Sequence, residues 1–168
     1  MNKKINLNFL WYLIAIFVIV IDLITKKVTD GIVFQEGIKG IFAIESFHNT
    51  GASFSMFSGS KAAQIIFIIL GIIVSVLIVL YSLLAKKSNL NAWFFVGASL
   101  MVGGIIGNVV DRIFLGYVRD FISLQFMNFA VFNIADSALT IGVISLIVWL
   151  LFFSYKEKST ISKNKKGK

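Results

Sequence analysis

The chain has 168 residues, of which 58% are hydrophobic and 14% charged, and its mean hydropathy is +0.90. This composition excludes a soluble domain and predicts an integral membrane protein. The chain has no cysteine and only one histidine, which excludes disulfides and thiol nucleophiles and disfavours a zinc site, so we expect neither a metal nor a cofactor.

Four apolar segments follow one another along the chain, at residues 9–24, 62–85, 92–107 and 133–153. Each is close to the roughly 20 residues that a helix needs to cross the hydrocarbon core of a bilayer. The third segment is rich in glycine, which allows helices to approach closely in lipid. The sequence therefore predicts four transmembrane helices.

The basic residues are unevenly distributed between the two sides that these spans define. Ten of the sixteen lie before the first span, between the second and third, or after the fourth. Basic residues near span ends stay in the cytoplasm, so we expect both termini, Lys86 and Lys87 to be cytoplasmic. The net charge of +8 then reflects topology and attraction to anionic membrane lipids, and we expect no nucleic-acid partner. Residues 1–155 would form one membrane domain, and the basic tail 156–168 would be disordered.

The loop between the first two spans, residues 27–61, is long enough to hold structure of its own. Residues 32–34 and 41–44 are β-prone and are separated by Gly37 and Gly40. We therefore expect an all-α membrane protein with four transmembrane helices and a small, outward-facing, β-like cradle in this first loop.

Acidic and amide side chains gather at the outward ends of the spans. These residues are Asp22, Asp111, Asp120, Asp136, Asn49, Asn108 and Asn133. A carboxylate at the hydrocarbon boundary is costly and marks a candidate functional site. Asp120 and Asp136, brought together at this boundary, would suffice to share one proton across a water molecule.

Several of these polar residues also have structural interpretations. Asn133 and Asp136 have the spacing of a helix N-cap and its N3 partner, so Asp136 could cap a helix, act chemically, or do both. Arg112 would share a helix face with Asn108, and could hold carbonyl groups or form a bridge to Asp120 or Asp22. Asp22, Lys26 and Lys27 could be a polar collar at the end of the first span.

Other functional classes fit the sequence less well. His48 and Ser53 suggest a serine protease, but both lie on one short loop with no separate orienting carboxylate. A small proton-coupled exporter would explain the hydrophobicity and the acids, although not their grouping on one side. A binding protein without catalytic activity on the same scaffold remains an alternative.

Five short segments in order resemble the motifs of lipoprotein signal peptidase, also called signal peptidase II. They are Asp22 with residues 25–26, then residues 49–54, 107–112, 118–122 and 132–137. The resemblance covers the chain from Asp22 to about Thr140. It implies a membrane aspartic endopeptidase of the bacterial cell membrane that cuts prolipoproteins before the lipid-modified cysteine, with its site toward the outer leaflet.

The resemblance also implies roles for individual residues. Asp120 and Asp136 match the catalytic pair, and a second set would bind substrate or shape the site: Asn49, Gly51, Asn108, Arg112, Asn133 and Ala135. Asp22, Lys26 and Asp111 would be structural polar residues. The implied partners are lipid-modified prolipoproteins, membrane lipids and the cyclic peptide inhibitor globomycin. The chain departs from the family pattern at Arg119, which we expect to lower the pKa of Asp120, and at residues 130–131, which lack a proline.

Overall fold

The computed structural model describes residues 10–51, 59–85 and 90–154. Several sequence-based predictions fall outside these ranges and are therefore not tested by the structure: the disordered tail, the lysines at positions 3, 4, 86 and 87, and Ser53.

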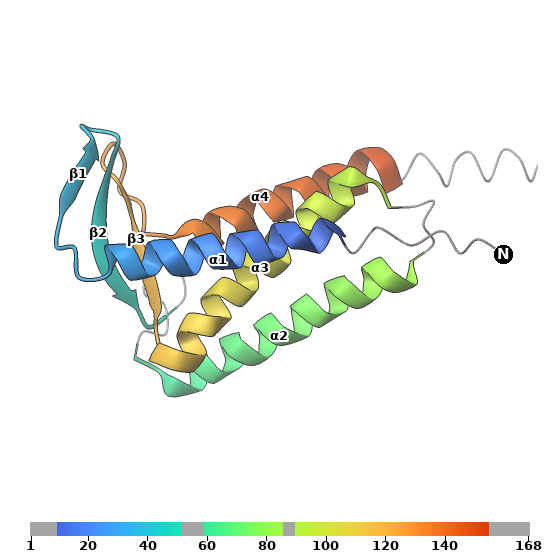
Figure 1. The fold of residues 1–168 in the computed structure, drawn as a ribbon, viewed down its shortest axis with the longest axis horizontal. Coiled ribbons are helices and arrows are strands. Elements are labelled where there is room, and N and C mark those ends of the chain that lie inside the picture. Colours follow the sequence, from blue (N-terminus) through green and yellow to red (C-terminus); the bar gives the residue numbers. More distant parts are fainter. Residues whose placement is uncertain (1–9, 52–58, 86–89, 155–168) are drawn as a thin grey trace, which may run out of the picture.

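In the described part of the chain, four α-helices run lengthwise through the molecule, and a small sheet closes one end (Figure 1). The helices are α1 (Tyr12–Thr29), α2 (Lys61–Leu84), α3 (Ala92–Leu115) and α4 (Ile134–Trp149), and α4 continues as the π-helical turn η4 (Leu150–Ser154). Three of these helices, α2, α3 and α4, have a polar N-cap residue. The side chains of Ser60, Asn91 and Asn133 each accept a hydrogen bond from a backbone N–H of the first turn.

The third helix is longer than the sequence predicted. The expected span 92–107 ended before the polar residues, but α3 continues through Asn108, Asp111 and Arg112 to Leu115. These side chains bond to neighbouring elements instead of ending the helix. Gly116, with a φ of 78°, provides the left-handed residue at which α3 stops. The three polar residues are thus held on one rigid element.

The sheet contains three antiparallel strands in the order β1 (Gln35–Ile38), β2 (Phe42–Asn49) and β3 (Val118–Leu124). A sheet involving the first loop is confirmed, but its third strand comes from the connection between α3 and α4. The strand expected at residues 32–34 is wrong, since the ladder starts with Gln35 opposite Ile44, and Gly37 lies inside β1. β-propensity identified apolar runs but not the partner strand, which fixes the register.

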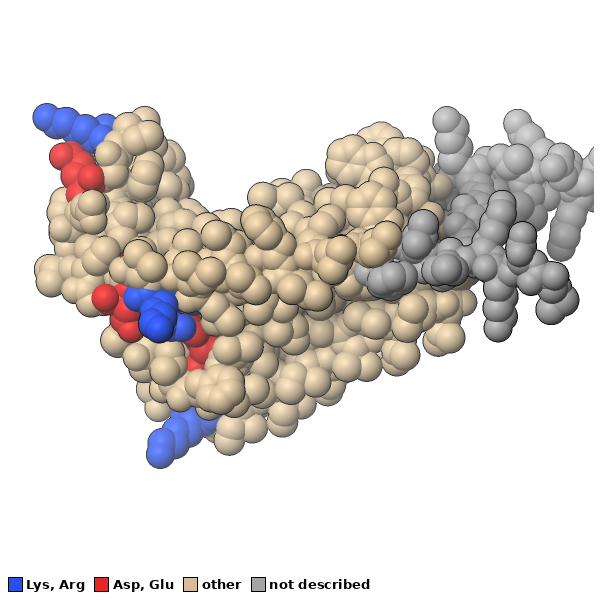
Figure 2. All heavy atoms as spheres, in the orientation of Figure 1, with Lys and Arg blue, Asp and Glu red and all other residues tan. Residues whose placement is uncertain are grey.

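Among residues 10–51, 59–85 and 90–154, three helices are long and apolar enough to cross a membrane: Lys61–Leu84, Ala92–Leu115 and Ile134–Phe153. Helix α1 has 18 residues and carries Asp22, Lys26 and Lys27, so it does not meet the same test within the described part of the chain. On the face shown in Figure 2, the charged side chains gather at the sheet end, and the helical surface beside them is uncharged. This distribution is that of a membrane protein.

Small residues allow α3 to pack closely against α1 and α4, as the glycine-rich sequence predicted. A Cβ atom on Gly103 would lie 2.8 Å from the Cβ atom of Val18. A Cβ atom on Gly104 would overlap the carbonyl oxygen of Ala135. Because backbones meet here without intervening side chains, the ends of α1, α3 and α4 nearest the sheet are held in fixed relative positions.

Candidate active site

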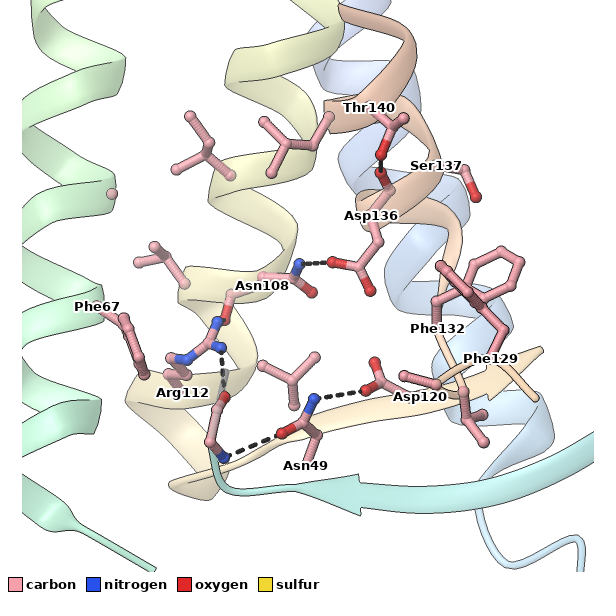
Figure 3. Close-up of a pocket in the computed structure, with 18 of the residues that line it drawn as sticks. Asn49, Phe67, Asn108, Arg112, Asp120, Phe129, Phe132, Asp136, Ser137 and Thr140 are labelled. Carbon is pink, nitrogen blue, oxygen red and sulfur yellow. Dashed lines mark hydrogen bonds between the residues drawn. The ribbon is translucent and has the colours of Figure 1, made fainter. Parts of the chain in front are cut away.

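A cavity of about 670 Å³ lies where the helices meet the sheet, bordered by α2 on one side and by α4 on the other (Figure 3). Its wall is mainly apolar, and Asp120 and Asp136 both contribute to it. The lining residues are Asn49, Gly51, Phe67, Gly71, Ile105, Asn108, Val109, Arg112, Val118, Asp120, Phe129, Ala130, Val131, Phe132, Asp136, Ser137, Leu139, Thr140 and Ile141.

Asp120 lies on β3, opposite Phe47 of β2, and is 2% exposed. Its carboxylate accepts hydrogen bonds from two side-chain amides, Asn49 Nδ2 at 2.9 Å and Asn133 Nδ2 at 2.6 Å. Burial, followed by the charge of Asp136, raises the pKa of Asp120 to about 7. A carboxyl group with this pKa can hold a proton near neutral pH.

Asp136 occupies the N3 position of α4 and forms a capping box with Asn133. The backbone N–H of Asp136 donates to Asn133 Oδ1 at 2.9 Å, and that of Asn133 donates to Asp136 Oδ2 at 3.3 Å. The capping interpretation is therefore right. It leaves Asp136 Oδ1 facing Asn108, whose Nδ2 donates to it at 2.7 Å (Figure 3). The cap thus holds the second carboxylate at the cavity wall.

Each of the three amides is oriented by a separate donor. Asn49 Oδ1 accepts the backbone N–H of Gly51 at 3.0 Å, and Asn133 Oδ1 accepts that of Asp136. Asn108 Oδ1 accepts from Lys26 Nζ at 2.9 Å and from Asn133 Nδ2 at 3.1 Å. With the amide oxygens occupied in this way, the NH₂ groups point at the two carboxylates.

Arg112 lies on α3 on the side of the cavity nearer α2 (Figure 3). It donates to the carbonyl oxygens of Asn108 at 3.4 Å and Gly51 at 3.3 Å, and its guanidinium group lies 5.2 Å from the centre of the Phe67 ring. The expected bridge to Asp120 or Asp22 is absent among the described residues, so its carbonyl-holding interpretation fits better. A planar cation remains at the cavity wall.

Behind the cavity, Lys26 and Asp22 are fully buried, with 0% of either side chain exposed, and form an ion pair of 2.7 Å. The collar interpretation is therefore wrong for these two residues. Asp22 Oδ1 also accepts the backbone N–H of Ala135 at 2.8 Å, which satisfies a free donor in the first turn of α4. Helix α1 thus helps to hold the helix end that carries Asp136.

Arg119 is turned toward Asp111 and away from a pairing with Asp120. Its Nη2 and Nε atoms donate to the Asp111 carboxylate at 2.7 and 3.2 Å, and its backbone N–H donates there at 3.0 Å. The hydrogen bond to Asp111 raises the pKa of Arg119. The expectation that Arg119 lowers the pKa of Asp120 is wrong, because Arg119 is paired with Asp111 and burial raises the pKa of Asp120.

Ala135 and His48 are placed differently from the cavity residues. Ala135 is fully buried between α3 and α4, where Gly104 and Gly107 leave room for it. His48 is exposed, stacks on Tyr117 with ring centres 4.2 Å apart and lies 3.1 Å from Asp30, so an adjacent carboxylate does exist. His48 does not line the cavity.

The α2 wall of the cavity was not predicted from the sequence. Phe67 and Gly71 lie within residues 65–74 of α2, a stretch that contains no polar side chain. The available signal was Gly71 itself, since a Cβ atom there would lie 2.7 Å from Val109 Cγ2. The glycine brings α2 close to α3 beside the cavity.

The fold and the site together define a helical membrane protein with a paired-carboxylate cavity at one end. The family model described as signal peptidase (SPase) II matches residues 14–152, and the chain belongs to this family. The resemblance predicted from the five motifs is thus confirmed.

Known proteins similar to this chain agree with the family assignment. The lipoprotein signal peptidase of Lactobacillus johnsonii is 38% identical over 152 residues, covering 88% of this chain and 96% of that one. That of Enterococcus faecalis is 41% identical over 117 residues, 70% of each chain. A solved bacterial membrane enzyme superposes with a TM-score of 0.74 at 36% identity, covering 88% of this chain and 89% of that chain. The chain is accordingly a membrane peptidase that removes signal peptides from prolipoproteins.

Proposed function

We propose that the protein is an aspartic endopeptidase that cuts prolipoproteins on the N-terminal side of a diacylglyceryl-modified cysteine, with Asp120 and Asp136 as its catalytic pair. The observation that carries this proposal is that both carboxylates line one cavity, accept bonds from oriented amides and have no cation paired with them among the described residues. Two such groups provide a general acid and a general base.

The raised pKa of Asp120 supports a division of roles between the two carboxylates. In this mechanism Asp120 holds the proton at rest, whereas Asp136 is ionised beside the positive end of the α4 dipole. Asp136 takes a proton from water as the water oxygen attacks the scissile carbonyl carbon, and Asp120 gives its proton to the carbonyl oxygen. Asp136 then protonates the leaving nitrogen as the C–N bond breaks, and the intermediate's hydroxyl proton returns to Asp120.

The surroundings of the pair suit a lipid-bearing peptide. Carbonyl groups of an extended substrate could accept from Arg112, as Gly51 now does, or from Asn49. Apolar residues of α2, α3 and α4 line the remaining wall, where acyl chains would be accommodated. By the family resemblance, the inhibitor globomycin would occupy the same cavity.

The test is direct cleavage. Detergent-purified protein incubated with a lipid-modified prolipoprotein should release the signal peptide and leave the modified cysteine as the new N-terminal residue, as read by mass spectrometry. The same precursor without the diacylglyceryl group is the control for lipid recognition. Cleavage at another bond, or none with a substrate that a known signal peptidase II cuts, would overturn the proposal.

We also propose that α1 spans the membrane in addition to α2, α3 and α4, which gives four spans. Both termini would be cytoplasmic, and the sheet would lie on the outward side. The buried pairing of Asp22 with Lys26 supports this assignment, because it neutralises two charges that would otherwise be costly in lipid. The lysine distribution sets the orientation.

Single cysteines introduced into this cysteine-free chain test the topology. An impermeant thiol reagent applied to intact cells should label position 39 and should reach position 87 only after the membrane is opened. Labelling of position 87 but not of position 39 in intact cells would show that the orientation is the opposite of the proposed one.

Asn49→Ala should move the alkaline limb of the pH–kcat profile to higher pH, by roughly one pH unit. The Asn49 amide bonds to Asp120 and lowers its pKa, so removing the amide raises that pKa further and the proton is kept to higher pH. The measurement is the pH profile of cleavage. His48→Ala, an exposed change at the neighbouring position, is the control, and an unchanged limb in the Asn49 variant would contradict the assignment of the proton to Asp120.

A further inference from the structure

We propose that Lys26 is a positioning residue for catalysis, whose ammonium group fixes the Asn108 carboxamide so that its NH₂ group is held against Asp136. This inference rests on the catalytic role proposed for Asp136. It gives a function to a buried cation that does not itself line the cavity.

Lys26 is enclosed by oxygen atoms from two helices. Its Nζ atom lies 2.7 Å from Asp22 Oδ2 on α1, and on α3 it lies 2.9 Å from Asn108 Oδ1 and 3.6 Å from Asp111 Oδ2. The side chain is fully buried. Asp22 alone balances the charge of one ammonium, so the bond to Asn108 is not needed for charge balance and calls for a separate explanation.

The bond to Asn108 connects Lys26 to the catalytic pair. An ammonium only donates, so it selects the oxygen of the Asn108 amide and leaves Nδ2 to donate to Asp136 at 2.7 Å. The reversed amide would place its NH₂ group against both the ammonium and the NH₂ group of Asn133. The orientation of the donor that holds Asp136 is therefore set by a charge beyond it.

A purely structural role would require only neutralisation of Asp22. Asp111 has its own cation in Arg119, with Nη2 2.7 Å from Oδ1, whereas Lys26 is the single cationic partner of Asp22 among the described residues. Replacing Asp22 and Lys26 together by neutral residues removes both charges at once. An asparagine at position 22 still offers an oxygen to the backbone N–H of Ala135.

The double variant Lys26→Met/Asp22→Asn separates the two roles. It should insert and keep a thermal midpoint near that of the unmodified protein, but its kcat should fall roughly ten- to a hundredfold with little change in KM, because an oriented hydrogen bond to a charged group is weakened. Lys26→Gln/Asp22→Asn returns a neutral donor and should recover part of that loss. Lys27→Met, the same change at the exposed neighbour, should be without effect.

The pH profile is a second readout that a structural role would not move. The groups facing Lys26 are Asp22 and Asp111, and beyond Asn108 lies the catalytic pair. The charge of Lys26 lowers the pKa of Asp120. Lys26 bonds to Asn108, beside the catalytic pair, and Asp22 does not, so loss of the Lys26 charge should outweigh loss of the Asp22 charge. The pH profile of the Met double variant should therefore move to higher pH.

Three outcomes would overturn the inference. The first is an unchanged kcat and pH profile in the Met double variant. The second is a Gln double variant that is no more active than the Met double variant at equal stability. The third is failure of both double variants to insert, which would make the ion pair a requirement of the fold. Asp136→Asn measured in parallel distinguishes this inference from the proposed function, because an active Asp136→Asn protein would refute the catalytic pair whatever Lys26 does.

Discussion

Asp120→Asn and Asp136→Asn should each reduce cleavage of a lipid-modified prolipoprotein on the order of ten-thousandfold or more, with membrane insertion intact. An amide can neither take the proton from water nor return one to the leaving nitrogen. At position 136 an asparagine still supports the cap of α4, so capping alone predicts a stability change of about 1 kcal/mol or less and an active enzyme. The double variant should be scarcely worse than either single one, because the two groups act as a unit.

The measurement is the initial rate of signal-peptide release, together with the thermal midpoint in detergent. Asp30→Asn is the matched control, since Asp30 is an exposed carboxylate that bonds to His48 and does not line the cavity. A rate near that of the unmodified protein in either Asn variant would show that the residue concerned is not catalytic.

Ala135→Leu should abolish cleavage and lower the thermal midpoint. Ala135 is fully buried, and its backbone and Cβ atom pack against Gly104 and Gly107 of α3. Extra methylenes in a packed interior cost about 1–3 kcal/mol and displace the backbone. Here the displaced backbone would be the turn of α4 that carries Asp136, so the two carboxylates would separate.

Val143→Leu tests whether added bulk on α4 is harmful in itself. Val143 is on the same helix but 38% exposed, and its replacement should leave both cleavage and the midpoint nearly unchanged. Normal turnover by Ala135→Leu would mean that α3 and α4 can separate here without cost to the site, which the Gly104 contact argues against.

The class of the molecule and the identity of its polar residues could be read from the sequence because both depend on local chemistry. Acids and amides beside apolar runs are too costly to be incidental, and Asp120, Asp136, Asn49 and Asn108 indeed line one cavity. The capping box of Asn133 and Asp136 is likewise a local pattern, readable from a spacing of three.

The sequence-based predictions that were wrong concern contacts between segments distant in the chain. The expected end of the third span followed from its polar residues, but Asp111 and Asn108 are stabilised within the helix by Arg119 and Lys26. The strand β3 was missed because its pairing partner, β2, lies across two membrane helices in the sequence. Arg119 was assigned to its sequence neighbour Asp120, yet strand geometry sends adjacent side chains to opposite faces, and Arg119 meets Asp111.

Only Gly116 and Tyr117 separate the end of α3 from the start of β3, and Arg119 ties the strand back to Asp111 on that helix. Asp120 therefore cannot shift independently of α3, and the close contact at Gly104 joins α4 to the same unit. Helices in a thicker or thinner bilayer adjust by tilting. In this protein a tilt would carry both carboxylates together, so the distance between them should be insensitive to the thickness of the membrane in which the protein resides.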